Sequence, residues 1–131
     1  MIVLDASALL ETLLRTEAGL SIRRRLFAPD ETLHAPHLID VEVSQVIRRF
    51  VARNEISPQD GRDFLEIVAD LPLQRYPHTI LLPRMWELRE NLSAYDACYI
   101  ALAEALDAPL LTHDGRLARS SGNHRAQIQF V

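Results

Sequence analysis

The sequence contains no lysine, so all 14 of its basic residues are arginine. Schiff-base chemistry needs a lysine amine and a phosphate-binding P-loop needs a Gly-Lys dipeptide, so neither mechanism is available to this chain. Cysteine is almost as scarce, because the single Cys98 cannot form an intrachain disulfide and argues against a cysteine-based zinc site. No apolar run approaches the roughly 18 residues expected of a membrane span.

The opening segment MIVLDASALL lacks the basic region and the small-residue cleavage site of a signal peptide, so we expect a cytoplasmic protein. A length of 131 residues fits one domain, and we expect residues 1–131 to form it. Hydrophobic residues make up 48% of the chain and charged residues 24%, which is typical of a globular protein. The net charge of -4 argues mildly against nucleic-acid binding, unless acids gathered around bound cations account for much of it.

Short β-favouring runs alternate along the chain with segments in which apolar residues recur at helical spacing. The clearest helix follows Pro36, where Ile39, Val43 and Ile47 share one face. We expect strands at 2–4, 32–35, 73–76, 110–112 and 127–131. We expect helices at 7–14, 17–27, 37–54, 58–70, 78–91 and 94–107, and a short helix from Asp114. This alternation predicts a three-layer α/β/α domain with a parallel sheet.

Two aspartates, Asp5 and Asp114, follow the expected strands at 2–4 and 110–112. Ligands of open parallel sheets bind at the carboxyl ends of the strands, near the point where the strand order reverses. The two carboxylates point into one crevice if these strands are neighbours, which the sequence pattern alone does not establish. The alternative is that each aspartate is an N-cap that accepts hydrogen bonds from the first turn of the following helix.

Three further acids lie on expected helices. Glu42 and Asp40 fall at opposite edges of the apolar stripe of one helix, so spacing does not choose between them. Asp96 belongs to the segment YDACYIALAEAL, which is apolar around almost the whole helix, so its carboxylate needs a neutralising partner. That partner is a helix N-terminus, an arginine, or a cation shared with other acids. Carboxylates that converge on one crevice would select Mg²⁺ or Mn²⁺ rather than zinc.

Three segments resemble a known nuclease family when taken in order: IVLDASALL, APHLIDVEVSQVIRRF and LSAYDACYIALAEALDAPLLTHDGRLAR. They are similar to the PIN-domain nucleases, and specifically to the VapC toxins of bacterial VapBC toxin–antitoxin pairs. The resemblance covers essentially the whole chain. It implies a five-stranded parallel sheet in the order 3-2-1-4-5, in which the strands that precede Asp5 and Asp114 are neighbours.

The resemblance also implies a catalytic site made of four carboxylates, from Asp5, Glu42, Asp96 and Asp114, hereafter the four acids. It places Glu42 rather than Asp40 at the family's glutamate position. It implies that Asp5, Asp96 and Asp114 bind Mg²⁺ or Mn²⁺, and that Glu42 orients the attacking water or binds the ion through it. The hydroxyls of Ser7 and Thr112 match positions that line such sites, or they are local caps. One departure is Gly115-Arg116, where relatives often have other polar residues.

The function implied by the resemblance is a metal-dependent endoribonuclease that is the toxin of a type II toxin–antitoxin pair. Its partners would be an RNA substrate, a small VapB-like antitoxin and a second copy of itself in a homodimer. Arg49 and Arg53 share a helix edge with Glu42 and could guide the RNA backbone, or they are ordinary surface charges. An apolar groove along the first helices, which are rich in leucine, would hold the antitoxin, and the alternative for most of these leucines is burial in the core or in a homodimer interface.

Two other functions compete with this interpretation. In the first, Asp5 would itself be phosphorylated, as in receiver domains and haloacid-dehalogenase-like phosphatases, but those folds use a lysine that this chain lacks. In the second, the chain would be a catalytically silent PIN-fold binding module or scaffold. The presence of all four acids argues against a silent module, and an activity assay with added Mn²⁺ would distinguish such a module from a nuclease.

Overall fold

The computed structural model describes all residues from 1 to 131. Its five parallel strands form one sheet in the order β3-β2-β1-β4-β5, as the resemblance implies. The sheet is formed by β1 (Ile2–Leu4), β2 (Leu33–Pro36), β3 (Leu73–Tyr76), β4 (Leu110–Thr112) and β5 (Ile128–Phe130). The strand order reverses between β1 and β4, so the crevice expected of an open α/β sheet lies at their carboxyl ends.

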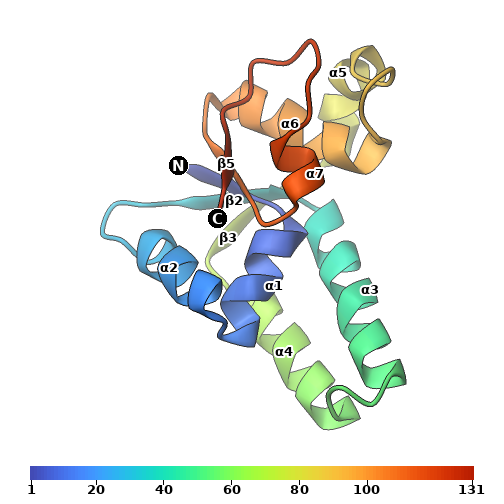
Figure 1. The fold of residues 1–131 in the computed structure, drawn as a ribbon. Coiled ribbons are helices and arrows are strands. Elements are labelled where there is room, and N and C mark those ends of the chain that lie inside the picture. Colours follow the sequence, from blue (N-terminus) through green and yellow to red (C-terminus); the bar gives the residue numbers. More distant parts are fainter.

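Seven α-helices cover the two faces of this sheet (Figure 1). The first four helices lie on one side of the sheet, and α5, α6 and α7 lie on the other. The reason is that the chain first moves from β1 toward the β3 edge of the sheet and later toward the β5 edge. Right-handed crossovers that run in opposite directions along a sheet place their helices on opposite faces. The helices are α1 (Ala6–Leu14), α2 (Glu17–Leu26), α3 (Leu38–Ala52), α4 (Pro58–Asp70), α5 (Leu82–Glu87), α6 (Ala94–Leu106) and α7 (Gly115–Ala118). The predicted three-layer α/β/α fold is confirmed.

One hydrophobic core lies between these layers, and α6 contributes most to it. Seven consecutive residues of α6, 97–103, are buried, which fits the apolar composition of the segment all around the helix. On the other side of the sheet, α3 buries Ile39, Val43 and Ile47, the apolar face expected from the sequence. No helix is long and apolar enough to cross a membrane.

The expected helix at 78–91 is wrong in its extent. A 3-10 turn spans His78–Leu81, and the α-helix α5 is limited to Leu82–Glu87. Pro83 lies in the first turn of α5, where its missing N–H costs nothing, but in the interior of a longer helix it would remove a backbone hydrogen bond.

The second strand extends one residue further than expected, to Pro36. Pro36 pairs with Tyr76 of β3, whereas the pairing of β2 with β1 ends at His34. A proline is tolerated at this place because β1 no longer requires a backbone donor from β2.

Candidate active site

The four acids line a single cavity of about 740 Å³ at the carboxyl edge of the sheet. They are Asp5 after β1, Glu42 on α3, Asp96 on α6 and Asp114 after β4. The pairing of Leu4 with Leu111 makes β1 and β4 neighbours, so the residues that follow these two strands meet. The structure therefore supplies the adjacency that the sequence pattern left open.

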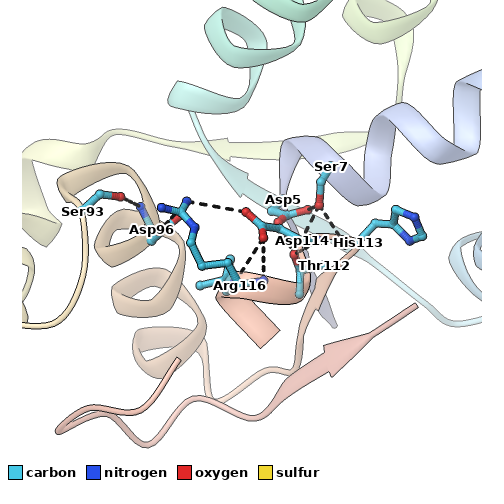
Figure 2. Close-up of polar contacts among 9 residues, drawn as sticks. Asp5, Ser7, Ser93, Asp96, Thr112, His113, Asp114 and Arg116 are labelled. Atoms are coloured by element: carbon cyan, nitrogen blue, oxygen red, sulfur yellow. Dashed lines mark hydrogen bonds and ion pairs between the residues drawn. The ribbon is translucent and has the colours of Figure 1, made fainter. Parts of the chain in front are cut away.

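Asp5 is buried, and both of its carboxylate oxygens accept hydrogen bonds (Figure 2). Its Oδ1 accepts from the Ser7 hydroxyl at 2.7 Å and from the Ala8 backbone N–H at 2.9 Å, so Asp5 is the N-cap of α1. Its Oδ2 accepts from the Thr112 hydroxyl at 2.5 Å. Asp5 is thus both a helix cap and a wall of the cavity, and the two interpretations of the sequence do not exclude each other.

The hydroxyls of Ser7 and Thr112 connect Asp5 to the segment after β4. Ser7 Oγ accepts from the backbone N–H of His113 at 2.8 Å, and Thr112 Oγ1 accepts from the backbone N–H of Asp114 at 2.9 Å. Each hydroxyl therefore donates to Asp5 and accepts from the β4–α7 segment. This network holds the positions of Asp5 and Asp114 relative to each other.

Arg116 on α7 lies between Asp96 and Asp114, as Figure 2 shows. Its guanidinium is 3.3 Å from the Asp96 carboxylate and 3.6 Å from that of Asp114. Asp114 Oδ1 also accepts from the backbone N–H of Arg116 at 2.7 Å and so begins α7. The N-cap of α6 is Ser93, so Asp96 itself is not the cap of its helix. The partner that the sequence demanded for Asp96 is an arginine in this structure.

Glu42 is held by a tyrosine that the sequence analysis missed. The Tyr99 hydroxyl donates to Glu42 Oε2 at 2.5 Å, and the Tyr99 side chain is buried under the cavity. Tyr99 lies three residues after Asp96 on α6, a spacing that puts both on one helix face. That spacing is a signal by which the sequence could have indicated Tyr99 as a further polar residue at the site.

Two carboxyl groups of the cavity resist ionisation. Burial raises the pKa of Asp5, although hydrogen bonds from Thr112, Ala8 and Ser7 act in the opposite direction. Burial likewise raises the pKa of Glu42, and the nearby charges of Asp5 and Asp96 raise it further. Because the acids lie near one another in a partly desolvated cavity, an added cation would favour their ionised forms.

The structure distinguishes Glu42 from Asp40, which the helical spacing did not. Asp40 forms a two-pronged ion pair with Arg75 at 2.7 and 3.0 Å and does not line the cavity. Of the two arginines proposed to guide RNA, Arg49 lines the cavity, whereas Arg53 lies near Glu55 at 3.9 Å. His113 is packed against Phe130 with ring centroids 5.4 Å apart and does not line the cavity.

Comparisons with known proteins agree with this geometry. The PIN domain family model matches residues 2–123. Two ribonucleases of Mycobacterium tuberculosis, VapC12 and VapC9, are 46% and 48% identical to this chain over 131 residues, covering all of it and 99% and 98% of the relatives. This chain belongs to the PIN-domain family, among the VapC ribonucleases.

Solved structures share the fold of this VapC-family protein. A chain of the VapBC2 complex of Rickettsia felis, bound to a promoter DNA fragment, has a TM-score of 0.70 at 14% identity, with 99% of this chain and 98% of that chain covered. The VapC20 toxin of Mycobacterium tuberculosis, described as cleaving the sarcin-ricin loop, has a TM-score of 0.63 at 14% identity, with 95% and 100% covered.

The donor set of the cavity fits a hard divalent cation. Its candidate ligands are carboxylate and hydroxyl oxygens, which Mg²⁺ and Mn²⁺ prefer, and it contains neither cysteine nor histidine. As placed, no three histidine, cysteine, aspartate or glutamate side chains are close enough to share one ion. The positive charge of Arg116 between Asp96 and Asp114 explains how these two acids are neutralised without a metal.

Proposed function

We propose that this VapC-family protein is a Mg²⁺- or Mn²⁺-dependent endoribonuclease and the toxin of a toxin–antitoxin pair. The observation that carries the proposal is the convergence of the four acids on one cavity at the strand-order reversal. The mycobacterial relatives are named ribonucleases and align with this chain over their whole length. Metal dependence is inferred from the all-oxygen donor set and the raised pKa of Asp5 and Glu42.

In this mechanism Asp5, Asp96 and Asp114 would hold the ion once their carboxylates come closer together than in this structure, and the hydroxyls of Ser7 and Thr112 keep Asp5 oriented. When bound there, the ion would supply Lewis-acid chemistry that lowers the pKa of water and stabilises charge on the phosphoryl oxygens. Glu42, fixed by the Tyr99 hydroxyl, orients the attacking water by accepting its proton in a hydrogen bond. Water, rather than the ribose 2′-hydroxyl, attacks, so the products carry a 3′-hydroxyl and a 5′-phosphate.

The competing function, a silent PIN-fold scaffold, is not favoured. A scaffold has no reason to keep Asp5 and Glu42 in surroundings that raise the pKa of both carboxyl groups, since their charge costs stability at neutral pH. Functional sites are where such perturbed acids concentrate.

The test is RNA cleavage by purified Asp5→Asn and Asp96→Asn variants in the presence of Mn²⁺. Both should lose cleavage, while Asp40→Asn should retain it, because Asp40 is an acid of the same region that is paired with Arg75 outside the cavity. Sequencing the 5′ ends of the fragments would identify the cleaved RNA. Near-wild-type activity in either site variant would refute the proposed site.

We also propose that a separate small antitoxin binds this protein and inhibits it. Two structural neighbours come from toxin–antitoxin complexes, of Rickettsia felis and of Klebsiella pneumoniae. The antitoxin would place an arginine or lysine among the four acids, where Arg116 already shows that a guanidinium is accommodated. Its apolar part would bind a groove between α1, α2 and α4, at which Leu13, Phe27 and Ile67 are partly or largely exposed.

Co-expression of the small reading frame next to this gene, followed by copurification and a cleavage assay, tests the antitoxin proposal. A neighbour that neither binds nor inhibits would refute the toxin–antitoxin assignment and leave the nuclease assignment standing. Light scattering of the protein purified alone tests the further proposal that it forms a homodimer. A single cooperative unfolding transition would support the proposal that residues 1–131 fold as one domain.

A further inference from the structure

Two exposed apolar side chains flank the acids of the cavity. Val41 is 68% exposed and directly precedes Glu42 on α3, and Tyr95 is 61% exposed and directly precedes Asp96 on α6. Both line the same cavity as the four acids. The opening of the cavity therefore presents an aromatic ring and a branched aliphatic group within one residue of two acids.

Neither side chain is used by the core. The inner face of α3 is formed by Ile39 and Val43, which lie two residues before and after Val41 and are fully buried. The residues of α6 from 97 to 103 are buried, whereas Tyr95 in the first turn is directed to the cavity. Because the core uses neither side chain and both line the cavity of the four acids, both are free to contact a molecule bound there.

We propose that Tyr95 forms a base-binding subsite, on whose ring the nucleobase next to the scissile phosphate stacks, with Val41 contacting the same nucleotide. This inference rests on the proposed function and adds a substrate contact to it. A phosphodiester held at the four acids brings its own nucleotides against the cavity wall, and Tyr95 is the aromatic residue exposed on that wall. The flat face of a tyrosine accepts any base that has left its stack.

Charge at the cavity supports a nucleotide as the occupant. Arg49 on α3 and Arg116 on α7 line the same cavity, and both carry guanidinium groups that suit phosphates. An aromatic ring and two arginines in one cavity match the combination of stacking and backbone contacts by which proteins hold single-stranded nucleic acid. The position differs from the groove at α1, α2 and α4 that we assign to the antitoxin.

The cleavage experiment uses a synthetic RNA that the wild type cuts, with single abasic nucleotides placed at each position around the cut. In the wild type, one abasic position should lower kcat/KM by about 10- to 100-fold, mainly through KM, which corresponds to the loss of one stacked base. Tyr95→Ala should lower kcat/KM for the intact RNA by a similar factor. In this variant, the abasic nucleotide at that position should lower kcat/KM no further. Tyr95→Phe keeps the ring and should stay within about threefold of the wild type.

The control is Trp86→Ala, which removes an aromatic residue of similar exposure, 68%, that does not line the cavity. It should cut both RNAs as the wild type does. Melting temperatures of all variants exclude a loss of fold. If the loss in Tyr95→Ala and the loss from the abasic nucleotide were additive at every position, the base would not stack on Tyr95 and the proposal would be overturned.

A binding measurement keeps the inference testable even if no cleaved RNA is found. In the Glu42→Gln background with Mn²⁺, RNA carrying 2-aminopurine should lose fluorescence on binding, and adding Tyr95→Ala should abolish this quenching. Unchanged quenching would overturn the proposal. The proposal would also be overturned if Tyr95→Ala left cleavage and quenching intact but no longer bound the antitoxin. Tyr95 would then belong to the antitoxin-binding surface.

Discussion

Two carboxylate clusters lie near opposite ends of α6, and the pKa values of their buried carboxyl groups are shifted in opposite directions. The first contains Glu104, whose side chain is 5% exposed and accepts two hydrogen bonds from Arg84, at 2.7 and 3.1 Å, and one from the backbone N–H of Arg125. Arg84 also donates to the carbonyl of Asn123, which fastens the C-terminal segment to α5 and α6. The hydrogen bonds from Arg84 lower the pKa of Glu104.

The second cluster is the cavity, where burial raises the pKa of Asp5 and Glu42. Its hydrogen-bond donors are mostly neutral hydroxyl and backbone groups, and Arg116, the one arginine paired with its acids, is largely exposed. Glu104 has an arginine as its hydrogen-bond donor, whereas Asp5 and Glu42 receive hydrogen bonds only from neutral groups. That difference separates a structural ion pair from a site that receives a cation from outside.

The largest expected contrast between the two clusters is in catalysis. Glu42→Gln should lower kcat by on the order of 10³-fold, since it removes the group that orients the attacking water. Glu104→Gln should leave the kcat of the folded protein within about twofold of the wild type, because Glu104 does not line the cavity. RNA cleavage with Mn²⁺, normalised to folded protein, measures both, and equal losses would erase the distinction.

Metal should stabilise only one cluster. At about 100 times its Kd, Mn²⁺ should stabilise the wild type by about 2.7 kcal/mol through mass action, seen as a rise in melting temperature. Glu104→Gln should show the same rise, whereas Asp96→Asn should show much less of it. A rise of equal size in Asp96→Asn would place the ion outside the cavity.

Removing the carboxylate charge should weaken the structural cluster. Glu104→Gln leaves the Arg84 guanidinium without its anion, and we expect a loss of about 2 kcal/mol in the free energy of unfolding, below the range for fully buried pairs because Arg84 is partly exposed. Urea denaturation measures this change. A variant as stable as the wild type would show that the ion pair is dispensable.

The pH dependence should have opposite signs in the two clusters. The folded-state pKa of Asp5 lies above its ordinary value of 3.8, so its charge costs stability at neutral pH and the cost disappears as the pH falls through that raised pKa. Metal-free Asp5→Asn should therefore be more stable than the wild type at pH 7, by on the order of 1 kcal/mol, and this gain should shrink as the pH falls through the raised pKa of Asp5.

For Glu104 the pKa is lowered from 4.5, so its stabilisation is present above pH 4.5 and is lost only as the pH falls through the lowered value. The deficit of Glu104→Gln should consequently be the same at pH 7 and pH 5. Thermal melts of both variants and the wild type at the two pH values test the pair. A deficit that shrank between pH 7 and pH 5 would contradict the assignment of Glu104.

The smallest expected effect concerns Arg116, the cation nearest to the four acids. Arg116→Ala should tighten Mn²⁺ binding by about two- to fivefold, because its exposed ion pairs with Asp96 and Asp114 compete with the metal. Calorimetric titration of Mn²⁺ into the metal-free protein measures the Kd, with Arg53→Ala as a control outside the cavity. Weaker binding would show that Arg116 assists the ion instead of competing with it.

Local sequence determined the elements of this protein. The buried positions Ile39, Val43 and Ile47 recur at helical spacing, so α3 was predictable, and the short apolar runs at 2–4 and 110–112 became β1 and β4. Because these apolar runs end directly before Asp5 and shortly before Asp114, the two acids were recognisable as candidate site residues. The exception was the extent of the helix at 78–91, where Pro83 limited it.

The arrangement between elements was decided only by the tertiary structure. Spacing along one helix could not choose between Asp40 and Glu42, because the choice depends on Arg75 on β3 and Tyr99 on α6, which the fold brings to opposite edges of α3. Likewise, Arg116 meets Asp96 only because α7 and α6 lie together on one face of the sheet. The periodicity of a helix or strand indicates which side of that segment is buried. The charges next to a carboxylate, in contrast, belong to residues that are distant in the chain. Their positions follow from the order of the strands in the sheet.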